Sequence, residues 1–477
     1  MVIRCLHRLG LALLACSIPA FAAELRVGRA AVPITPPIGS PIGSSYGLSP
    51  STGVHDDLFA KAIVLEVEGV KAAIVACDLV SIRKPIVAET RRLIAANTGV
   101  PTDHTIISAT HCHAGPQMHP LFLSMTPEPA RDLGEKYIAA LPAKIAEAVR
   151  RAEADLRPAR AWLGSQRVEG ISFNRRFLLK NGTVQMNPRR GNPDIVRPMG
   201  PIDPELSVVY FDAPDGTPLA THVNFALHVA IVGGLEVSAD YPGVLSRALA
   251  DVKGPDMLTL FTNGMSGNIN HLDVNDTRPL SGHAAAARVG TILASGVLET
   301  YKHLRPVAPG PLAARTRRVD LPVTPVTPSE VERAKQTLAG FGKPGAPPFH
   351  DVVNAWKVLD IAALDGKPLD TEVQAITLGD DLAWVGMPGD AFVELGLSVK
   401  QNSPFRHTVV GEQSGSGAIS YVPNRKAFPE GGYEVISTRF APGGGEMLSD
   451  AAIKLLIEMY YSGRASGAGA ASAMGRQ

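Results

Sequence analysis

The stretch FAKAIVLEVEGVKAAIVAC, residues 59–77, decides the predicted fold class. Its two apolar runs, Phe59–Val67 and Lys71–Cys77, flank a Glu-Gly turn and are typical of a β-hairpin. A helical pattern follows over Arg83–Asn97, and a further β-rich run covers His104–Thr110. A hairpin that continues into a strand–helix–strand unit indicates a mixed α/β architecture.

The rest of the chain continues this mixture of hairpins and crossovers. Strands are predicted over Leu206–Phe211, Leu219–Phe225, Met257–Phe261, Val373–Leu378 and Leu382–Gly386, and helices over Glu135–Ala154, Tyr241–Val252, Ala284–Tyr301 and Ser449–Tyr461. We therefore predict one large domain of mixed β-sheets flanked by helices over residues 24–462. The Gly/Ala/Ser-rich stretch 463–477 is predicted to be a disordered tail.

Charge and composition exclude one class of partner. Over 477 residues, 46 Lys and Arg nearly cancel 45 Asp and Glu, and no basic stripe is interleaved with aromatic residues. Nucleic acid is therefore not an expected partner. Apolar residues make up 45% of the chain, which is enough for the core of a globular enzyme-sized domain.

The first residues have the pattern of an export signal. A positive start precedes the apolar run Leu9–Ala15, and the small residues of Ala20–Ala22 precede Ala23. Residues 1–23 are therefore predicted to be a cleaved signal peptide, so that the protein is periplasmic or secreted. The sequence ending at Cys16, Leu-Leu-Ala-Cys, supports a lipoprotein anchor as the alternative. No later run of about 18 apolar residues predicts a transmembrane span.

Removal of this signal would leave two of the four cysteines, Cys77 and Cys112. Two thiols do not make a disulfide framework, and a chain of this size does not need one. We expect two unlinked, buried thiols, with pairing in the periplasm as the alternative.

The stretch SATHCHAGP, residues 108–116, carries the sharpest chemical signal. It follows a predicted strand, and strand ends are where α/β proteins usually build their sites. In an extended segment His111 and His113 face the same side and Cys112 faces away. Two imidazoles on one face suit zinc. The alternative is a pair of histidines hydrogen-bonded in a polar turn.

Two later segments add to this predicted site. His228 follows the strand predicted to end at Phe225 and offers a third nitrogen ligand. His222 is its competitor, because alternation places both histidines on one face. The segment NGMSGNINH, residues 263–271, follows another strand, and its small residues let the backbone approach a ligand closely.

The order and spacing of several segments resemble the neutral/alkaline, non-lysosomal ceramidase family over residues 25–460. The segments are GRAAVPITPP (28–37), GVHDDL (53–58), ATHCHAGP (109–116), FNRR (173–176), YVP (421–423) and GYE (432–434). The resemblance implies the α/β catalytic domain of that family and a zinc-dependent hydrolysis of amides.

The resemblance also implies a set of zinc ligands. These are His111, His228, Tyr421 and an acidic residue that the family supplies as Glu in a Pro-Gly-Glu context. Here the sequence Met-Pro-Gly-Asp supplies Asp390, which is one methylene shorter, and Glu394 is the alternative.

Other matching positions imply catalytic roles. His113, Arg175 and Tyr433 match the residues that in the family contact the substrate carbonyl and the metal-bound water. Asn270 stands where the family has a serine. Because an Asn cannot be acylated, hydrolysis here is expected to use the metal-bound water, with Asn270 orienting water or substrate.

The function implied by this resemblance is zinc-dependent hydrolysis of a carboxamide bond in a small-molecule or lipid N-acyl substrate, such as a ceramide. Two alternatives stay open: a zinc- or ligand-binding protein of the same fold without catalysis, and an esterase acting on another acyl substrate. Contact with a membrane surface and the oligomeric state also stay open.

Overall fold

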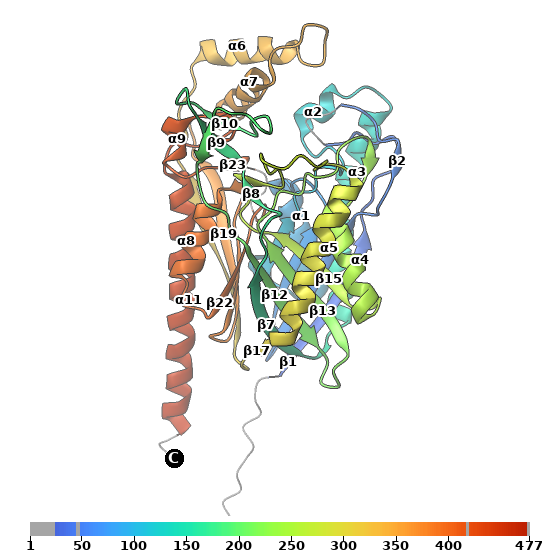
Figure 1. The fold of residues 1–477 in the computed structure, drawn as a ribbon. Helices are drawn as coiled ribbons and strands as arrows, with labels where there is room; N and C mark the ends of the chain where they lie inside the picture. The colour runs from blue at the N-terminus through green and yellow to red at the C-terminus, as the bar shows by residue number, and fades with distance from the viewer. Residues whose placement is uncertain (1–23, 44–47, 416–418, 475–477) are drawn as a thin grey trace, which may run out of the picture.

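The computed structural model describes residues 24–43, 48–415 and 419–474. The signal peptide predicted over residues 1–23, with its alternative anchor at Cys16, therefore lies outside the described residues. Three larger β-sheets stand around a shared interior, and helices cover their outer faces (Figure 1). This is a mixed α/β architecture with flanking helices, so the predicted fold class is confirmed.

The first sheet has the strand order β5-β4-β3-β1-β6. Its strands are β1 (Leu25–Pro33), β3 (Phe59–Val67), β4 (Val70–Cys77), β5 (Thr105–Ala109) and β6 (Arg157–Pro158). Strands β3 and β4 form the predicted hairpin, and helix α1 (Lys84–Thr98) carries the chain across to β5, which pairs with β4 in parallel. Helices α1 and α3 (Ala130–Ala154) share one apolar core with this sheet.

The second sheet has the order β15-β13-β12-β7-β17. Its strands are β7 (Arg160–Arg167), β12 (Glu205–Asp212), β13 (Pro218–Phe225), β15 (Leu258–Asn263) and β17 (Arg305–Pro306). Strands β12 and β13, both predicted, form a hairpin around an Asp-Gly turn, and β13 pairs with β15 in parallel. Helices α4 (Asp240–Lys253) and α5 (His283–Thr300) pack on the outer face.

The third sheet has the order β18-β19-β20-β22. Its strands are β18 (Leu312–Leu321), β19 (Leu369–Leu378), β20 (Leu382–Gly386) and β22 (His407–Gly411). Strand β20 pairs with β22 in parallel, after a crossover through helix α8 (Val393–Asn402). Helix α11 (Gly444–Met474) packs with α8 against this sheet.

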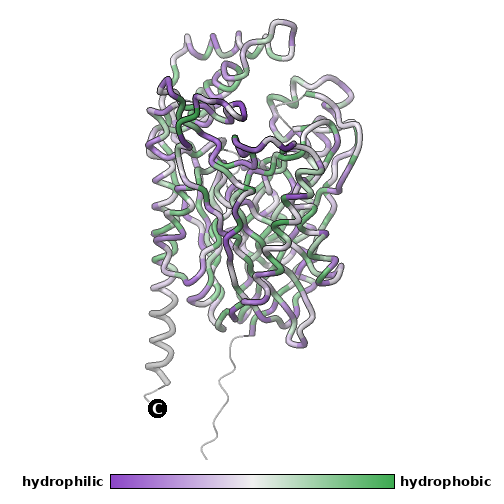
Figure 2. Tube along the Cα trace, in the orientation of Figure 1, coloured by the Kyte–Doolittle hydropathy of each residue, from purple (hydrophilic) through white to green (hydrophobic). Residues whose placement is uncertain are grey.

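The inner faces of the three sheets share one apolar core. Ile63 of the first sheet, Phe211 of the second and Trp384 of the third belong to the same buried cluster. Figure 2 shows hydrophobic residues along the strands at the centre and more hydrophilic residues on helix α6 above them. Central strands such as β4, β13 and β20 are buried on both faces, which explains why they are near-continuous apolar runs.

The remaining helices and strands are mostly short. The helices are α2 (Pro120–Met125), α6 (Pro328–Ala339), α7 (Phe349–Ala362), α9 (Ala427–Glu430) and α10 (Tyr433–Ile436), with 3-10 turns at Thr102–His104 and Tyr301–His303. The short strands are β2 (Gly53–Val54), β8 (Phe173–Asn174), β9 (Arg176–Leu179), β10 (Val184–Met186), β11 (Ile195–Pro198), β14 (Glu236–Val237), β16 (Ile269–Asn270), β21 (Asp390–Ala391) and β23 (Tyr421–Val422). Helices α2, α6 and α7 lie at the upper end in Figure 1.

The end of the chain differs from the prediction. Helix α11 runs through residue 474, so the backbone of residues 463–474 is helical where a disordered tail is predicted. Alanine has the highest helix propensity, and this stretch is rich in it as well as in glycine. Among the described residues, no helix has both the length and the apolar character needed to cross a bilayer.

Each large sheet contains one parallel strand pair, and this feature positions the site. The loops that follow β5, β13, β15, β20 and β22 all leave the carboxyl ends of these paired strands. Such strand ends are where open α/β sheets bind ligands. In this chain the loops from three sheets meet at one place.

Candidate metal centre and active-site cavity

Three histidine side chains converge in these loops. His111 and His113 follow β5, and His228 follows β13. The Nε2 atom of His111 lies 3.0 Å from Nε2 of His228 and 3.1 Å from Nε2 of His113. The ligand atoms of the three residues form a group that has the geometry to hold a metal ion.

In His111 and His228, the hydrogen-bond partner of Nδ1 determines which ring nitrogen carries the hydrogen. Nδ1 of His111 lies 2.7 Å from the carbonyl oxygen of Val80, and Nδ1 of His228 lies 3.3 Å from that of Ser266. A carbonyl only accepts, so each Nδ1 carries the hydrogen. Burial lowers the pKa of His111 to about 4 and that of His228 well below its usual range. Both rings are therefore neutral near pH 7 and point a bare Nε2 lone pair at each other.

Facing lone pairs at this distance repel unless a cation lies between them. A tetrahedral zinc with Zn–N bonds of about 2.0–2.1 Å would separate two nitrogens by roughly 3.3 Å. The three Nε2 atoms are close to that spacing, and the Nδ1 hydrogen bonds to carbonyls are the usual support for metal-bound histidines. The donor set therefore fits zinc.

The route by which His111 and His113 converge differs from the prediction of an extended segment. Strand β5 ends at Ala109, and His111 has a positive φ of 66°. A non-glycine residue in this region is strained, and such residues concentrate at functional sites. The left-handed turn, rather than strand alternation, brings the two imidazoles together. Cys112 faces away, as predicted, and its thiol contacts the carbonyl of Ser238.

The structure brings Asp390, and not Glu394, to the histidines. Oδ1 of Asp390 lies 3.4 Å from Nε2 of His111, and the Asp390 carboxylate also accepts a hydrogen bond from Gln413. Burial raises the pKa of Asp390 to about 6, and a bound cation would favour its ionised form. Glu394 lies on α8 and accepts a hydrogen bond from Asn268 at 2.9 Å.

The two tyrosines implied by the family resemblance lie beside Asp390. Strand β23 pairs with β21 so that Tyr421 is opposite Asp390, and the ring centroids of Tyr421 and Tyr433 are 5.3 Å apart. The Arg175 guanidinium lies 5.1 Å above the Tyr421 ring. These residues come from four different loops, yet all of them line one cavity.

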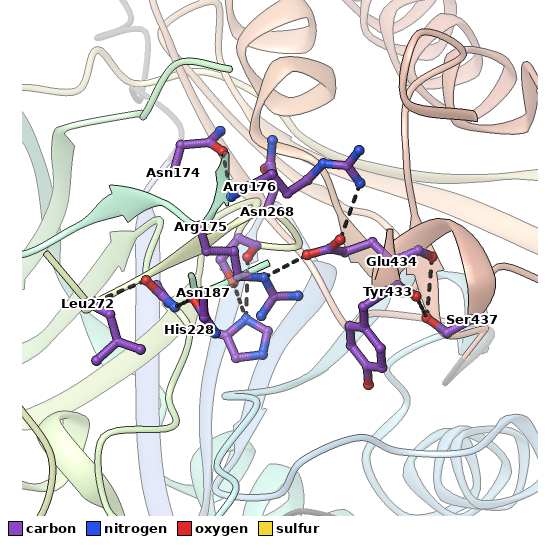
Figure 3. Close-up of polar contacts among 12 residues, drawn as sticks. Asn174, Arg175, Arg176, Asn187, His228, Asn268, Leu272, Tyr433, Glu434 and Ser437 are labelled. Carbon is purple, nitrogen blue, oxygen red and sulfur yellow. Dashed lines mark hydrogen bonds and ion pairs between the residues drawn. The ribbon is translucent and has the colours of Figure 1, made fainter. Parts of the chain in front are cut away.

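A buried acid that the sequence analysis does not single out holds Arg175 in place. Glu434 accepts from Nε of Arg175 at 2.9 Å and from Nη1 of Arg176 at 3.2 Å (Figure 3). Burial opposes the charge on Arg175, but Tyr421 and Glu434 together raise the pKa of its guanidinium. Nη2 of Arg175 is buried and has no hydrogen-bond partner among the described residues. It is a fixed donor with an unused hydrogen bond.

Asn270 lies behind the cavity wall. Its side-chain amide donates to Oδ1 of Asn187, and its own Oδ1 accepts from the backbone of Leu272 at 3.0 Å. Asn187 lines the cavity, whereas Asn270 is absent from its lining. Any influence of Asn270 on a bound substrate therefore passes through Asn187.

A second buried acid joins the loops behind the histidines. Glu412 accepts from the hydroxyl of Ser266 at 2.6 Å and from the backbone of Ala391 at 3.2 Å. Ser266 in turn supplies the carbonyl that orients His228. The contact is so close that a Cβ on Gly267 would lie 2.2 Å from the carbonyl oxygen of Asp390. This explains the small residues in the segment 263–271.

The cavity beside the histidines has a volume of about 770 Å³. Helix α7 contributes Phe349, Trp356 and Asp360 to its wall, and α2 contributes Phe122, whose ring lies 5.3 Å from that of Trp356. Apolar and aromatic side chains make up much of the lining, among them Met118, Phe122, Met186, Phe349, Trp356, Leu364 and Ile419. Such a cavity suits a mostly apolar ligand with a few polar groups.

The remaining histidines named in the sequence analysis, and the cysteines, lie away from the three converging nitrogens. His222 is buried between Thr262, 2.8 Å from its Nε2, and Trp384, which donates to its Nδ1 at 3.0 Å. His222 is therefore a hydrogen-bonded core residue. Strand β13 ends at Phe225, so the predicted alternation does not continue to His228. Cys77 and Cys112 are unlinked and buried, as expected.

Comparisons with known proteins find similarity to neutral ceramidases. A neutral ceramidase from Pseudomonas aeruginosa is 30% identical over 209 residues, which are 42% of this chain and 29% of that protein. The matched segment thus spans less than a third of that relative. No family model matches the chain.

Two solved structures share the fold. The crystal structure of neutral ceramidase from Pseudomonas aeruginosa superposes with a TM-score of 0.73 at 22% identity, covering 92% of this chain and 75% of that one. A ceramidase complexed with C2 gives a TM-score of 0.72 at 21% identity, covering 92% and 76%. The chain is therefore an α/β protein with the ceramidase fold.

Proposed function

We propose that this chain is an exported zinc-dependent hydrolase that cleaves the carboxamide bond of N-acyl, ceramide-like substrates. One observation carries the proposal: the bare Nε2 atoms of His111 and His228 and the carboxylate of Asp390 converge at the wall of a largely apolar cavity. The likeness to neutral ceramidases supports an amide bond as the target.

His111, His228, Asp390 and Tyr421 would hold the zinc. When bound there, the ion supplies Lewis acidity and lowers the pKa of a water towards about 7. Nε2 of His113 lies 3.1 Å from Nε2 of His111, so it is either a further ligand or the group that accepts the proton of that water. Burial lowers the pKa of His113 to about 3, so its ring is neutral and can accept a hydrogen bond, whereas taking up a proton near pH 7 needs a nearby negative charge such as that of Asp390 to raise this pKa.

Arg175 and Tyr433 would stabilise the oxygen of the substrate carbonyl as negative charge develops on it. Arg175 is suited to this role because Glu434 fixes its Nε and leaves Nη2 without a partner. A fixed donor in a site without water stabilises charge more than a mobile one, since no reorganisation is needed. The apolar walls would bind the acyl chain and exclude water.

Metal analysis combined with an N-acyl substrate panel tests this function. Purified protein is expected to contain about one zinc per chain and to release fatty acid from N-acyl amides. A chelator should abolish turnover and added zinc should restore it. Full zinc without turnover on any amide would favour the binding-protein alternative, and faster cleavage of matched esters would favour the esterase.

Replacing Asn270 tests its proposed positioning role. Asn270→Ala removes the amide that donates to Asn187, and the rate is expected to fall about 10- to 100-fold, as for a lost contact that orients the reacting groups. Asn275→Ala, on an exposed part of the same loop, is the control and should keep the full rate. Ceramide hydrolysis by Asn270→Ser with an inactive parent would contradict the proposal.

Export is part of this proposal and rests on the N-terminal sequence. Mass spectrometry of the mature protein is expected to find an N-terminus near Ala23. A lipid-modified Cys16 would show an anchored lipoprotein, and a full-length chain retained in the cytoplasm would contradict export.

A further inference from the structure

Two arginines lie in the cavity near the carboxyl end of helix α7. Arg83 and Arg439 both line the cavity together with Asp360. Arg439 is buried and fully engaged: it donates to Oδ2 of Asp360 at 3.0 and 3.1 Å, and its guanidinium lies 4.1 Å above the Trp356 ring. Asp360 therefore already has a close cationic partner.

Arg83 has no such partner. Across the described residues its side chain has no hydrogen bond, although its backbone carbonyl accepts from Ile86, and no carboxylate lies within ion-pair distance of its guanidinium. Its electrostatic neighbours are Asp360, which attracts it, and Arg439, which repels it. Half-buried beside another cation, the Arg83 guanidinium loses hydration without gaining a close counter-charge. An anionic ligand would supply that counter-charge.

The charges on the cavity wall show the same imbalance. The charged lining residues are Arg83, Arg175, Asp360, Asp390 and Arg439. Asp390 faces the histidines, Glu434 neutralises Arg175 from behind, and Asp360 neutralises Arg439. Arg83 alone among the lining arginines is left without a carboxylate in contact.

The surroundings of His119 show that the electrostatic potential beside Arg83 and Arg439 is positive. His119 lies with its ring 4.2 Å from that of Trp356 and accepts from the backbone of Leu121. Burial, together with Arg83 and Arg439, lowers the pKa of His119 to about 2. His119 is therefore uncharged and adds a polar group without competing for an anion.

Arg83 lies close in the chain to the segment that orients His111. It follows Val80, whose carbonyl orients His111, by three residues. Three residues span at most about 10 Å between their Cα atoms, and the Arg83 side chain lines the same cavity as the histidines. An anionic group a few bonds from the scissile amide would reach Arg83, whereas the far end of a long acyl chain would not.

We propose that Arg83, beside the Arg439–Asp360 pair, binds a carboxylate or sulfonate on the amine half of the substrate. This inference rests on the proposed hydrolase function and narrows it. The substrates are anionic N-acyl amides, such as N-acylated amino acids, rather than amides with a neutral amine half. Guanidinium groups suit this role because they pair with planar anions through two parallel hydrogen bonds.

The test compares matched substrates that differ in one charge. N-dodecanoylglycine carries a carboxylate, N-dodecanoyltaurine carries a sulfonate, and N-dodecanoylethanolamine is neutral and of similar size. Release of dodecanoic acid gives kcat and KM for each. The anionic substrates are expected to have kcat/KM about 10- to 100-fold above the neutral one, mainly through KM, as for a hydrogen bond to a charged group.

Variants of Arg83 then assign the preference to this side chain. Arg83→Gln should remove the preference and leave hydrolysis of the neutral substrate unchanged, and Arg83→Lys should restore part of it. Lys84→Gln is the matched control, because Lys84 is the next cation on the chain but pairs with Asp370 outside the cavity lining. It should keep the preference.

The outcomes separate the two proposals. Equal kcat/KM for charged and neutral substrates, or a preference that survives Arg83→Gln, would overturn the anion site while leaving the hydrolase intact. Absence of turnover on every N-acyl substrate would instead contradict the proposed function. In that case, binding of N-dodecanoylglycine that is weakened by Arg83→Gln would still support the anion site.

Discussion

Replacing His111 and His228 together with alanine is expected to remove the bound zinc and abolish hydrolysis. The two bare Nε2 atoms, 3.0 Å apart, are the core of the donor set, and a zinc site built on two histidines does not survive their loss. Each single substitution should lower zinc content sharply. After dialysis against metal-free buffer, the zinc content is measured by elemental mass spectrometry, and turnover of an N-acyl amide is measured on the same samples.

His222→Ala is the matched control for these variants. His222 is as buried as His228 and lies in the same stretch of chain, but its ring nitrogens form hydrogen bonds with Thr262 and Trp384. Its loss should cost about 1–3 kcal/mol of unfolding free energy, as for buried groups left unpaired, with zinc retained. Full zinc content in the double variant of His111 and His228 would refute the proposed metal site.

Glu434→Ala is expected to give the largest loss of stability. Glu434 is fully buried and is the shared acceptor for Arg175 and Arg176, which are also buried. Removing one partner of a buried ion pair leaves an uncompensated charge and costs about 3–5 kcal/mol. Urea unfolding measures this loss, and turnover should fall in the fraction that stays folded because Arg175 is no longer held.

Glu430→Ala separates this effect from the general loss of a carboxylate. Glu430 also pairs with Arg176, at 3.2 Å, but its side chain is 16% exposed and Arg176 keeps Glu434. The expected cost is about 1 kcal/mol or less, as for a partly solvated pair. Equal destabilisation by the two substitutions would show that Glu434 is not the anchor of the arginine pair.

Much of the architecture follows from local pattern. The hairpin of β3 and β4, helix α1 and strands β12 and β13 all form where the sequence predicts them. Apolar periodicity and turn residues act over a few positions, so one sequence is enough to place such elements. The alanine-rich end of α11 is the exception, since glycine content favours the opposite prediction.

For the candidate site, sequence and tertiary structure contribute different information. The sequence by itself determined the chemical types present at the strand ends: the histidines after β5 and β13 and an acid after β20. The family resemblance selects His228 and Asp390, whereas strand alternation alone leaves His222 open beside His228, and Glu394 stays the alternative acid. The tertiary structure separates them, since only one member of each pair reaches the point where the loops meet.

Only the tertiary structure revealed the groups that act across long sequence separations. Glu434 holds Arg175 from 259 residues away, and Arg83 shares the cavity with Asp360 and Arg439. No local signal marks Arg83 as unpaired, because pairing depends on which carboxylates the fold brings near it. Local pattern determines which elements form and which residue types end them. The packing of three sheets determines which side chains meet, because contacts between distant segments depend on all of the crossovers at once.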